Sequence, residues 1–232
     1  MDILIKNGTV VTASETIKSD VLLVGNKISH IANNIPATKN CKIIDAEEKY
    51  VIPGGIDPHV HMQLPTPAGP SADDFYTGSI AALFGGTTTL IDFVTPSKTQ
   101  SLVLALNERK KEAEKAICDY SFHVSPISWT SNTEQEIKDC IKSGITSFKV
   151  YLAYKNSVGL DYDNLYKVMK VVGNAGGLVT IHCEDGDKVD ELRDKYASEN
   201  KLSPLYHAKS RPAELEALAV QKSIELAAKA NC

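Results

Sequence analysis

The chain has 232 residues, of which 43% are hydrophobic and 23% are charged, and its formal net charge is −4. This composition is that of an ordinary globular protein with one or two domains. Because no basic stretch is interleaved with aromatic residues, we expect no nucleic-acid partner. No apolar run reaches the roughly 18 residues of a membrane-spanning helix, so we expect no membrane partner.

Residues 1–52 predict a small β-sheet module. The runs "ILIKNGTVVT", "SDVLLVGNKISHIA" and "CKIIDAEEKYVIP" are rich in β-branched and aliphatic residues. Turn pairs such as Asn7-Gly8 and Gly25-Asn26 separate them, as in hairpin-rich sheets. The first ten residues alternate apolar and polar positions, which is typical of a strand and not of a signal peptide.

Residues 53–232 alternate between β-rich and helical stretches, and glycines mark the helix ends. Repeated strand–helix units predict a parallel sheet, either a barrel or an open doubly wound sheet. Five such units are present, whereas a (β/α)8 barrel needs eight, so a barrel over residues 53–232 would be partial. We expect strands at 51–57, 87–94, 119–127, 145–154 and 178–185, and helices at about 74–85, 99–116, 132–144, 161–177, 187–199 and 211–230.

Three histidines fall near the C-terminal ends of predicted strands, where active sites of α/β folds form. His59 and His61 follow the first strand of the series, and His182 lies near the end of the fifth. Residues at i and i+2 of a strand share a face, so His59 and His61 would present two imidazoles to one point, as a zinc site requires. Asp57 nearby strengthens this interpretation. The alternative is two core histidines that merely pack together.

Lys149 lies inside the fourth predicted strand, in "SFKVYLAY". Burying its ammonium would be costly, so its pKa should fall. The neutral amine would then be available as a nucleophile, or it would take up carbon dioxide as a carbamate whose two oxygens bridge two cations. The alternative is a lysine that points outward and extends its ammonium past the helices into solvent.

The remaining histidines and the cysteines carry less signal. His123, on the third strand, either lines the interior or packs, whereas we place His30 in the β-module and His207 in a loop between helices. The five cysteines are scattered without a CxxC pair, which indicates free thiols in a reducing, cytoplasmic environment. Cys183 is interpreted as a buried structural thiol.

Five stretches together resemble the dihydropyrimidinase and D-hydantoinase family, which are cyclic amidohydrolases of the metal-dependent amidohydrolase superfamily. They are "GGIDPHVHMQLP", "DDFYTGSIAALFGGTTTLIDFV", "SFKVYLAYKN", "IHCEDGD" and "RPAELEA". They occur in the family's order and at its spacing. The resemblance covers essentially the whole chain and corresponds to the front half of a family member.

The resemblance implies a metal-dependent hydrolase of the (β/α)8 TIM-barrel type with two Zn2+ ions and a flanking β-sandwich, of which residues 1–52 would be a partial module. Carried over to this sequence, His59 and His61 bind the first zinc, N6-carboxylated Lys149 bridges both, and His182 binds the second. Tyr154 matches a tyrosine that donates a hydrogen bond to the substrate carbonyl, although it also suits an ordinary strand-end aromatic.

The activity implied is hydrolysis of the cyclic amide of 5,6-dihydrouracil, dihydrothymine or 5-substituted hydantoins to N-carbamoyl amino acids, in pyrimidine degradation. Gln63 stands where dihydroorotase-like sequences tend to carry an arginine that binds a carboxylate. Leu64, Pro65 and Pro67 make an apolar, stiff loop that suits a neutral ring. Leu64 and Tyr151, together with Tyr154, are therefore the candidate substrate-binding residues.

Three alternatives differ in function. A non-catalytic scaffold of the same family would have a degraded metal site, whereas all four expected ligands of the front half are present. Allantoinase is another cyclic amidohydrolase with the same metal set. A metal-free aldolase that forms a Schiff base on Lys149 leaves the three histidines unexplained.

The family's fourth metal-binding histidine and its catalytic aspartate come from later strands than this chain has. We therefore expect the chain to be part of a longer cytoplasmic enzyme and to be inactive alone. We also expect the complete protein to be a homo-oligomer, a tetramer as is common in the family.

Overall fold

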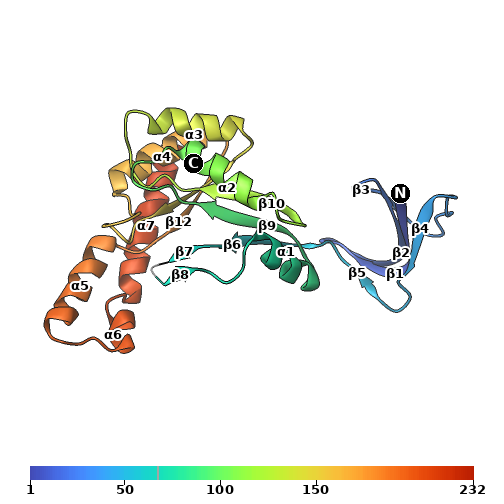
Figure 1. Cartoon of the computed structure of the whole chain (residues 1–232), viewed down its shortest axis with the longest axis horizontal. Helices are drawn as coiled ribbons and strands as arrows, with labels where there is room; N and C mark the ends of the chain where they lie inside the picture. Colours follow the sequence, from blue (N-terminus) through green and yellow to red (C-terminus); the bar gives the residue numbers. More distant parts are fainter. Residues whose placement is uncertain (67) are drawn as a thin grey trace. The chain divides into compact units, whose positions relative to one another are not determined.

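A computed structural model describes residues 1–66 and 68–232 (Figure 1). The chain divides into two compact units, Met1–Gly55 and Ile56–Cys232. This division falls close to the predicted boundary after residue 52. Pro67, which the sequence assigns to the apolar loop, lies outside the described residues.

The first unit is a single five-stranded sheet. Its central strand β1 (Asp2–Val11) pairs antiparallel with β2 (Thr16–Val24), which pairs antiparallel with β3 (Lys27–Ala32). On its other side β1 pairs in parallel with β4 (Cys41–Asp45) and then with β5 (Tyr50–Val51). Of the predicted sandwich, the described residues of this unit therefore form one layer.

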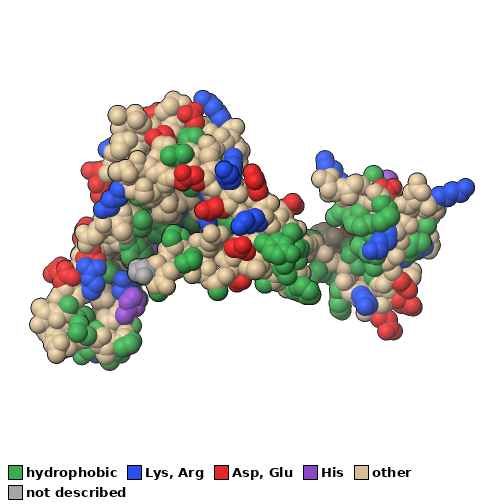
Figure 2. Space-filling view, viewed as in Figure 1, with side chains coloured by type: hydrophobic (Ala, Val, Ile, Leu, Met, Phe, Trp, Pro, Cys, Tyr) green, Lys and Arg blue, Asp and Glu red, His purple; other side chains and the backbone are tan. Residues whose placement is uncertain are grey.

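Some apolar side chains of this sheet are buried and others are exposed. Leu4 and Val21 are buried, whereas Ile28 and Ile43 are 61% and 54% exposed. Figure 2 shows hydrophobic side chains on the visible surface of the same unit. A half-covered sheet of this kind is what one layer of a sandwich presents before the second layer packs on it.

The second unit is built on a five-stranded sheet whose strands follow chain order. The last four strands of this unit pair in parallel. Parallel strands in chain order are the arrangement of a barrel. A doubly wound sheet would instead reverse its strand order at a switch point. The order is β12 (Leu178–His182), β11 (Ser147–Tyr151), β10 (Asp119–Val124), β9 (Thr87–Val94) and β6 (Gly55–Val60).

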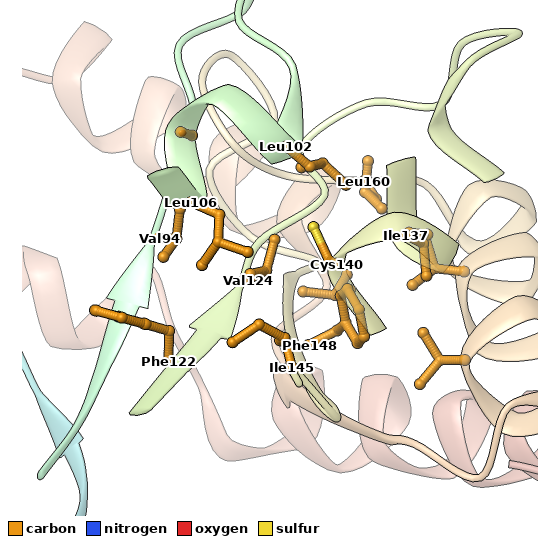
Figure 3. Close-up of a cluster of buried hydrophobic side chains, with 14 of the residues drawn as sticks. Val94, Leu102, Leu106, Phe122, Val124, Ile137, Cys140, Ile145, Phe148 and Leu160 are labelled. Atoms are coloured by element: carbon orange, nitrogen blue, oxygen red, sulfur yellow. The ribbon is translucent and has the colours of Figure 1, made fainter. Parts of the chain in front are cut away.

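Helices cover one face of this sheet and enclose the core. Figure 3 shows Val124 and Phe148, from two strands, meeting Leu106, Ile137 and Cys140, from two helices. All five side chains are essentially buried. The helices are α1 (Phe75–Phe84), α2 (Leu102–Ala113), α3 (Thr133–Lys142), α4 (Tyr162–Asn174), α5 (Gly186–Ser198), α6 (Pro204–Lys209) and α7 (Ala213–Ala230), and a short hairpin of β7 (Pro65–Thr66) and β8 (Gly69–Pro70) precedes α1.

The predicted order of strands and helices is confirmed, and two details differ. The strand predicted at 51–57 is two strands, β5 and β6, because Pro53 lacks an amide hydrogen and interrupts the run between two different sheets. His207, predicted in a loop, lies in α6. This helix has six residues, too few to show a helical period in the sequence.

Among the described residues, no helix combines the length and the apolar character needed to cross a membrane.

Candidate functional site

The two imidazoles of the HxH motif lie side by side at the end of β6. Their ring centroids are 5.2 Å apart, and the ring of Phe93, on the neighbouring strand β9, lies 4.6 Å from His59 and 4.7 Å from His61. Both histidines are exposed in this chain. Loss of water around His61 lowers its pKa, which favours the neutral ring that binds a metal.

Lys149 points to the same side of the sheet as the histidines. Its strand neighbours Phe148 and Val150 are buried in the helix-covered core, so alternation along β11 directs Lys149 to the opposite face. Its Nζ lies 5.7 Å from the centre of the Phe93 ring and 5.3 Å from that of Tyr151. With only 7% of its surface exposed, Lys149 does not extend between the helices into solvent, and that alternative is wrong.

The ammonium of Lys149 is not compensated by an opposite charge from the described residues. No carboxylate or hydrogen-bond acceptor among the described residues pairs with its Nζ, and burial lowers its pKa. A buried lysine without a partner favours the neutral amine. This is the chemical state that either attacks a carbonyl carbon or reacts with carbon dioxide.

A second group of side chains lies on the next strand. His182 on β12 is in register with Tyr151 on β11, and their rings are 6.1 Å apart. The ring of Tyr154 lies 5.3 Å from that of His182. His182 Nε2 donates to Glu184 across 2.7 Å, and Glu184 also pairs with Arg211 across 3.5 Å.

Tyr154 occupies an unusual backbone conformation. Its φ is +61°, in the left-handed region, and its carbonyl accepts hydrogen bonds from the amides of residues 157–159. Left-handed conformations of non-glycine residues persist where surrounding contacts enforce them and are frequent at functional sites. The turn leaves the Tyr154 side chain 44% exposed beside His182.

The loop after the histidines forms one wall of a cavity of about 430 Å³. Gln63 and Leu64 line it together with Phe93, whose ring touches both histidines. The loop is held by two hydrogen bonds between Leu64 and Ser71. The candidate substrate residues therefore fall into two places, with Leu64 beside the histidine pair and Tyr151 and Tyr154 beside His182.

The donor chemistry fits a metal in part. Among the described residues, no three histidine, cysteine or acidic side chains come together closely enough to hold a metal ion. The structure instead offers two imidazoles at the end of β6, a separate imidazole on β12, and Lys149 on β11 between these strands. An unmodified lysine is a poor bridge, so the set suits two metals only when Lys149 supplies oxygens as a carbamate.

His123 packs rather than lining a site, which resolves the two possibilities left by the sequence. Its Nε2 donates to the Pro58 carbonyl across 2.9 Å, and Nδ1 lies 2.6 Å from the Ser147 hydroxyl. Burial lowers its pKa, so the ring is neutral and Nδ1 accepts from the hydroxyl. His123 thereby links β10 to β6 and β11 and has no nitrogen free for a ligand.

Cys183 is half-buried against the core, and its Sγ lies 3.3 Å from the Ser223 hydroxyl. Burial raises the pKa of its thiol, which agrees with a structural role.

Sequence reasoning missed Asp92 and Arg109. Asp92 is completely buried on β9 and pairs with Arg109 of α2, and both bind the backbone of Met62, the residue after His61. The available signal was a lone acid in the apolar run "TTTLIDFV".

Residues 50–232 match the amidohydrolase family. The chain belongs to this family. It is 41% identical to a D-hydantoinase of Geobacillus stearothermophilus, covering 96% of this chain and 48% of that protein. It is 42% identical to a dihydropyrimidinase of Dictyostelium discoideum, covering 97% and 45%. The solved D-hydantoinase (dihydropyrimidinase) from Thermus sp. superposes with a TM-score of 0.95 at 37% identity, covering 99% of this chain and 50% of that one.

The predicted resemblance and the predicted fold class are thereby confirmed. The five-stranded parallel sheet with its helices is part of a metal-dependent hydrolase barrel. The chain spans about half the length of the curated relatives it matches.

Proposed function

We propose that this chain contributes the HxH, lysine and tyrosine part of a zinc-dependent cyclic amidohydrolase. One observation carries the proposal: in a chain of the amidohydrolase family, the paired imidazoles of His59 and His61 share one face of the sheet with Lys149, which is buried and has no partner among the described residues. Structural lysines of that burial are normally paired with a carboxylate.

His59 and His61 would hold one zinc ion, and Lys149, carboxylated on Nζ, would bridge it to a second. His182 would bind the second ion through Nδ1, because its Nε2 donates to Glu184 and so fixes which ring nitrogen keeps a lone pair. When bound, two zinc ions polarise an amide carbonyl and activate water. His59, His61 and His182 lie at or just after strand ends, and Lys149 lies in the middle of β11.

The protein's own groups would orient the ring. The Tyr154 hydroxyl would donate a hydrogen bond to the carbonyl oxygen under attack and stabilise negative charge there. Tyr151 and Leu64 would bound the ring with apolar surface. Burial raises the pKa of Tyr151, so its hydroxyl remains protonated and adds no charge to the site.

The same surfaces favour a neutral ring as the substrate. The amide of Gln63 offers no charge to bind a substrate carboxylate, and Leu64 beside it is apolar. We propose 5,6-dihydrouracil, dihydrothymine or a 5-substituted hydantoin, opened to an N-carbamoyl amino acid in pyrimidine degradation in the cytoplasm. A homotetramer is the proposed assembly of the complete protein.

The test compares this chain with the intact protein from its natural source. Zinc content and the hydrolysis of dihydrouracil, a 5-substituted hydantoin and allantoin are measured on both. Two zinc ions and hydrolysis of dihydrouracil or the hydantoin by the intact protein are expected. Preference for allantoin would reassign the substrate, and a folded intact protein without zinc or hydrolysis would indicate a non-catalytic scaffold.

Replacing His59 or His61 with Ala in the intact protein is expected to remove zinc and lower kcat/KM at least about 1,000-fold, because the metal supplies most of the activation of water and carbonyl. His30→Ala, in the exposed strand β3, is the control and should retain both. Full activity in the His59 or His61 variant would contradict the assignment.

A further inference from the structure

The carboxylate of Asp92 lies on the helix-covered face of β9. It shares this face with Leu90 and Val94, two residues away on either side, and all three side chains are buried, Asp92 completely. Its Oδ2 accepts a hydrogen bond from the Met62 amide across 2.7 Å, and its Oδ1 lies 2.8 Å from Nη2 of Arg109. The charge of Asp92 is thus directed at the backbone segment that follows the HxH motif.

Arg109 reaches the same backbone segment from α2. Its Nη2 donates to the Met62 carbonyl as well as to Asp92, and its guanidinium carbon lies 4.6 Å from the centre of the Phe75 ring. Nη1 pairs across 2.6 Å with Glu112, whose side chain is 46% exposed. The ion pair therefore binds both the amide and the carbonyl of one residue, Met62.

The position of Met62 explains why this matters for the site. Met62 directly follows His61, and Phe93, whose ring stacks on His61 at 4.7 Å and 25°, directly follows Asp92. The ion pair thus holds the backbone on one side of His61 and the strand that carries its stacking partner. The next residue, Gln63, has a φ of +49° and donates its amide to Asp73.

The Met62 side chain is fitted as closely as its backbone. The side chain packs directly on Gly78 of α1, where an added Cβ would meet the Met62 sulfur. A buried ion pair adds little stability over an apolar pair of the same size. What it adds is geometry, because the planar guanidinium and the carboxylate impose fixed hydrogen-bond directions.

We propose that Asp92 and Arg109 are positioning residues that set the orientation of His61 for metal binding. This inference rests on the metal site proposed above. Residues that orient a metal-binding histidine without contacting the metal typically weaken metal binding by about 10- to 100-fold when they are replaced.

The test uses Arg109→Lys, which keeps the charge but loses the planar fork, and Asp92→Asn, which keeps the shape but loses the charge. Glu112→Gln is the matched control, since it removes only the charge of the more exposed partner of the same arginine. Zinc affinity of each purified chain is measured by competition with a chelating dye, and the His61 ring signals are followed by NMR without metal. Urea unfolding establishes that each variant folds.

We expect both site variants to bind zinc roughly 10- to 100-fold more weakly and to shift the His61 signals, while Glu112→Gln changes neither. A folded Arg109→Lys chain with wild-type zinc affinity and unchanged His61 signals would overturn the proposal. If the wild-type chain binds no zinc, the metal site fails for this chain, and the His61 signals alone decide on the positioning role. If neither variant folds, hydrogen exchange of the wild-type Met62 amide decides, because exchange at the rate of an unstructured chain contradicts the clamp.

Discussion

Buried polar side chains in this protein differ in whether their polar atoms have hydrogen-bond partners. Lys149 and Asp92 are both buried in strands, yet Asp92 has three hydrogen-bond donors and Lys149 pairs with no described acceptor. Buried polar groups in proteins are normally satisfied. The satisfied group therefore holds the structure in place, and the unsatisfied one marks the proposed chemistry.

His123 tests the structural role of a satisfied residue. Replacing it with Phe keeps an aromatic ring but removes the hydrogen bonds to Pro58 and Ser147. We expect the free energy of unfolding to fall by about 1–3 kcal/mol, measured by urea titration, because each net hydrogen bond contributes about 0.5–1.5 kcal/mol. His30→Phe on the exposed β3 should change it little. Equal stability of the two variants would contradict the linking role of His123.

Burial of the cysteine thiols predicts how readily they react. Cys140 is completely buried, and burial raises its pKa to about 11, whereas Cys41 lies at the start of β4 and is partly exposed. Since the thiolate is the reactive form, iodoacetamide at pH 8 should alkylate Cys41 and spare Cys140 until urea unfolds the chain. Mass spectrometry of peptides after brief labelling measures both. Early labelling of Cys140 in the folded chain would show that the core opens readily.

At the level of secondary structure, aspartate caps fix where three of the helices begin. Asp74 caps α1 through the amides of Tyr76 and Thr77, and Thr77 completes a capping box. Asp161 and Asp185 cap α4 and α5 in the same way. Asp185 follows the end of β12 by three residues and Asp161 follows the end of β11 by ten, and each cap starts the helix that returns the chain to the helical layer.

Gly144, just after α3, tests the same point at a helix C-terminus. Its φ is +92°, and nothing lies within 4 Å of an added Cβ, so Gly144→Ala introduces backbone strain without a clash. We expect a loss of about 1–2 kcal/mol in urea unfolding. Gly85→Ala, at the end of α1 with a φ of −82°, is the matched control and should cost clearly less. Similar losses in both would show that the left-handed φ is not the cause.

For the molecule as a whole, the decisive feature of the second unit is its sheet order. β6 and β12 are the end strands of the described sheet, and Ile56 and Leu178 on them are 65% and 60% exposed. An open strand edge with exposed apolar side chains recruits other strands.

We therefore expect this chain alone to associate with increasing concentration in sedimentation velocity experiments. Leu178→Lys should weaken the association, because a lysine on an edge strand opposes pairing with another sheet. Leu202→Lys, equally polar and 73% exposed but outside the strands, should leave association unchanged. Equal effects of the two variants would show that general surface hydrophobicity drives the association and that the β12 edge does not.

The sequence by itself determined the order of the elements, the family and the candidate ligands. Alternation of apolar residues, caps and glycines is local, and so is the i, i+2 spacing of His59 and His61, which is why these features can be read without a fold. The same local reading failed where the partner is distant or the element is short. Pro53 splits one apparent strand between two sheets, and α6 is too short for a period.

Only the tertiary structure decided which polar residues have hydrogen-bond partners and which face the proposed site. Lys149 could point to either face until the buried positions of Phe148 and Val150 settled its direction. His123 could line a site until its two hydrogen bonds accounted for both nitrogens. Asp92 pairs with Arg109, which is 17 residues later in the sequence, and binds the amide of Met62, which is 30 residues earlier. Burial and hydrogen bonding depend on which strands and helices meet, and no local pattern in the sequence records that.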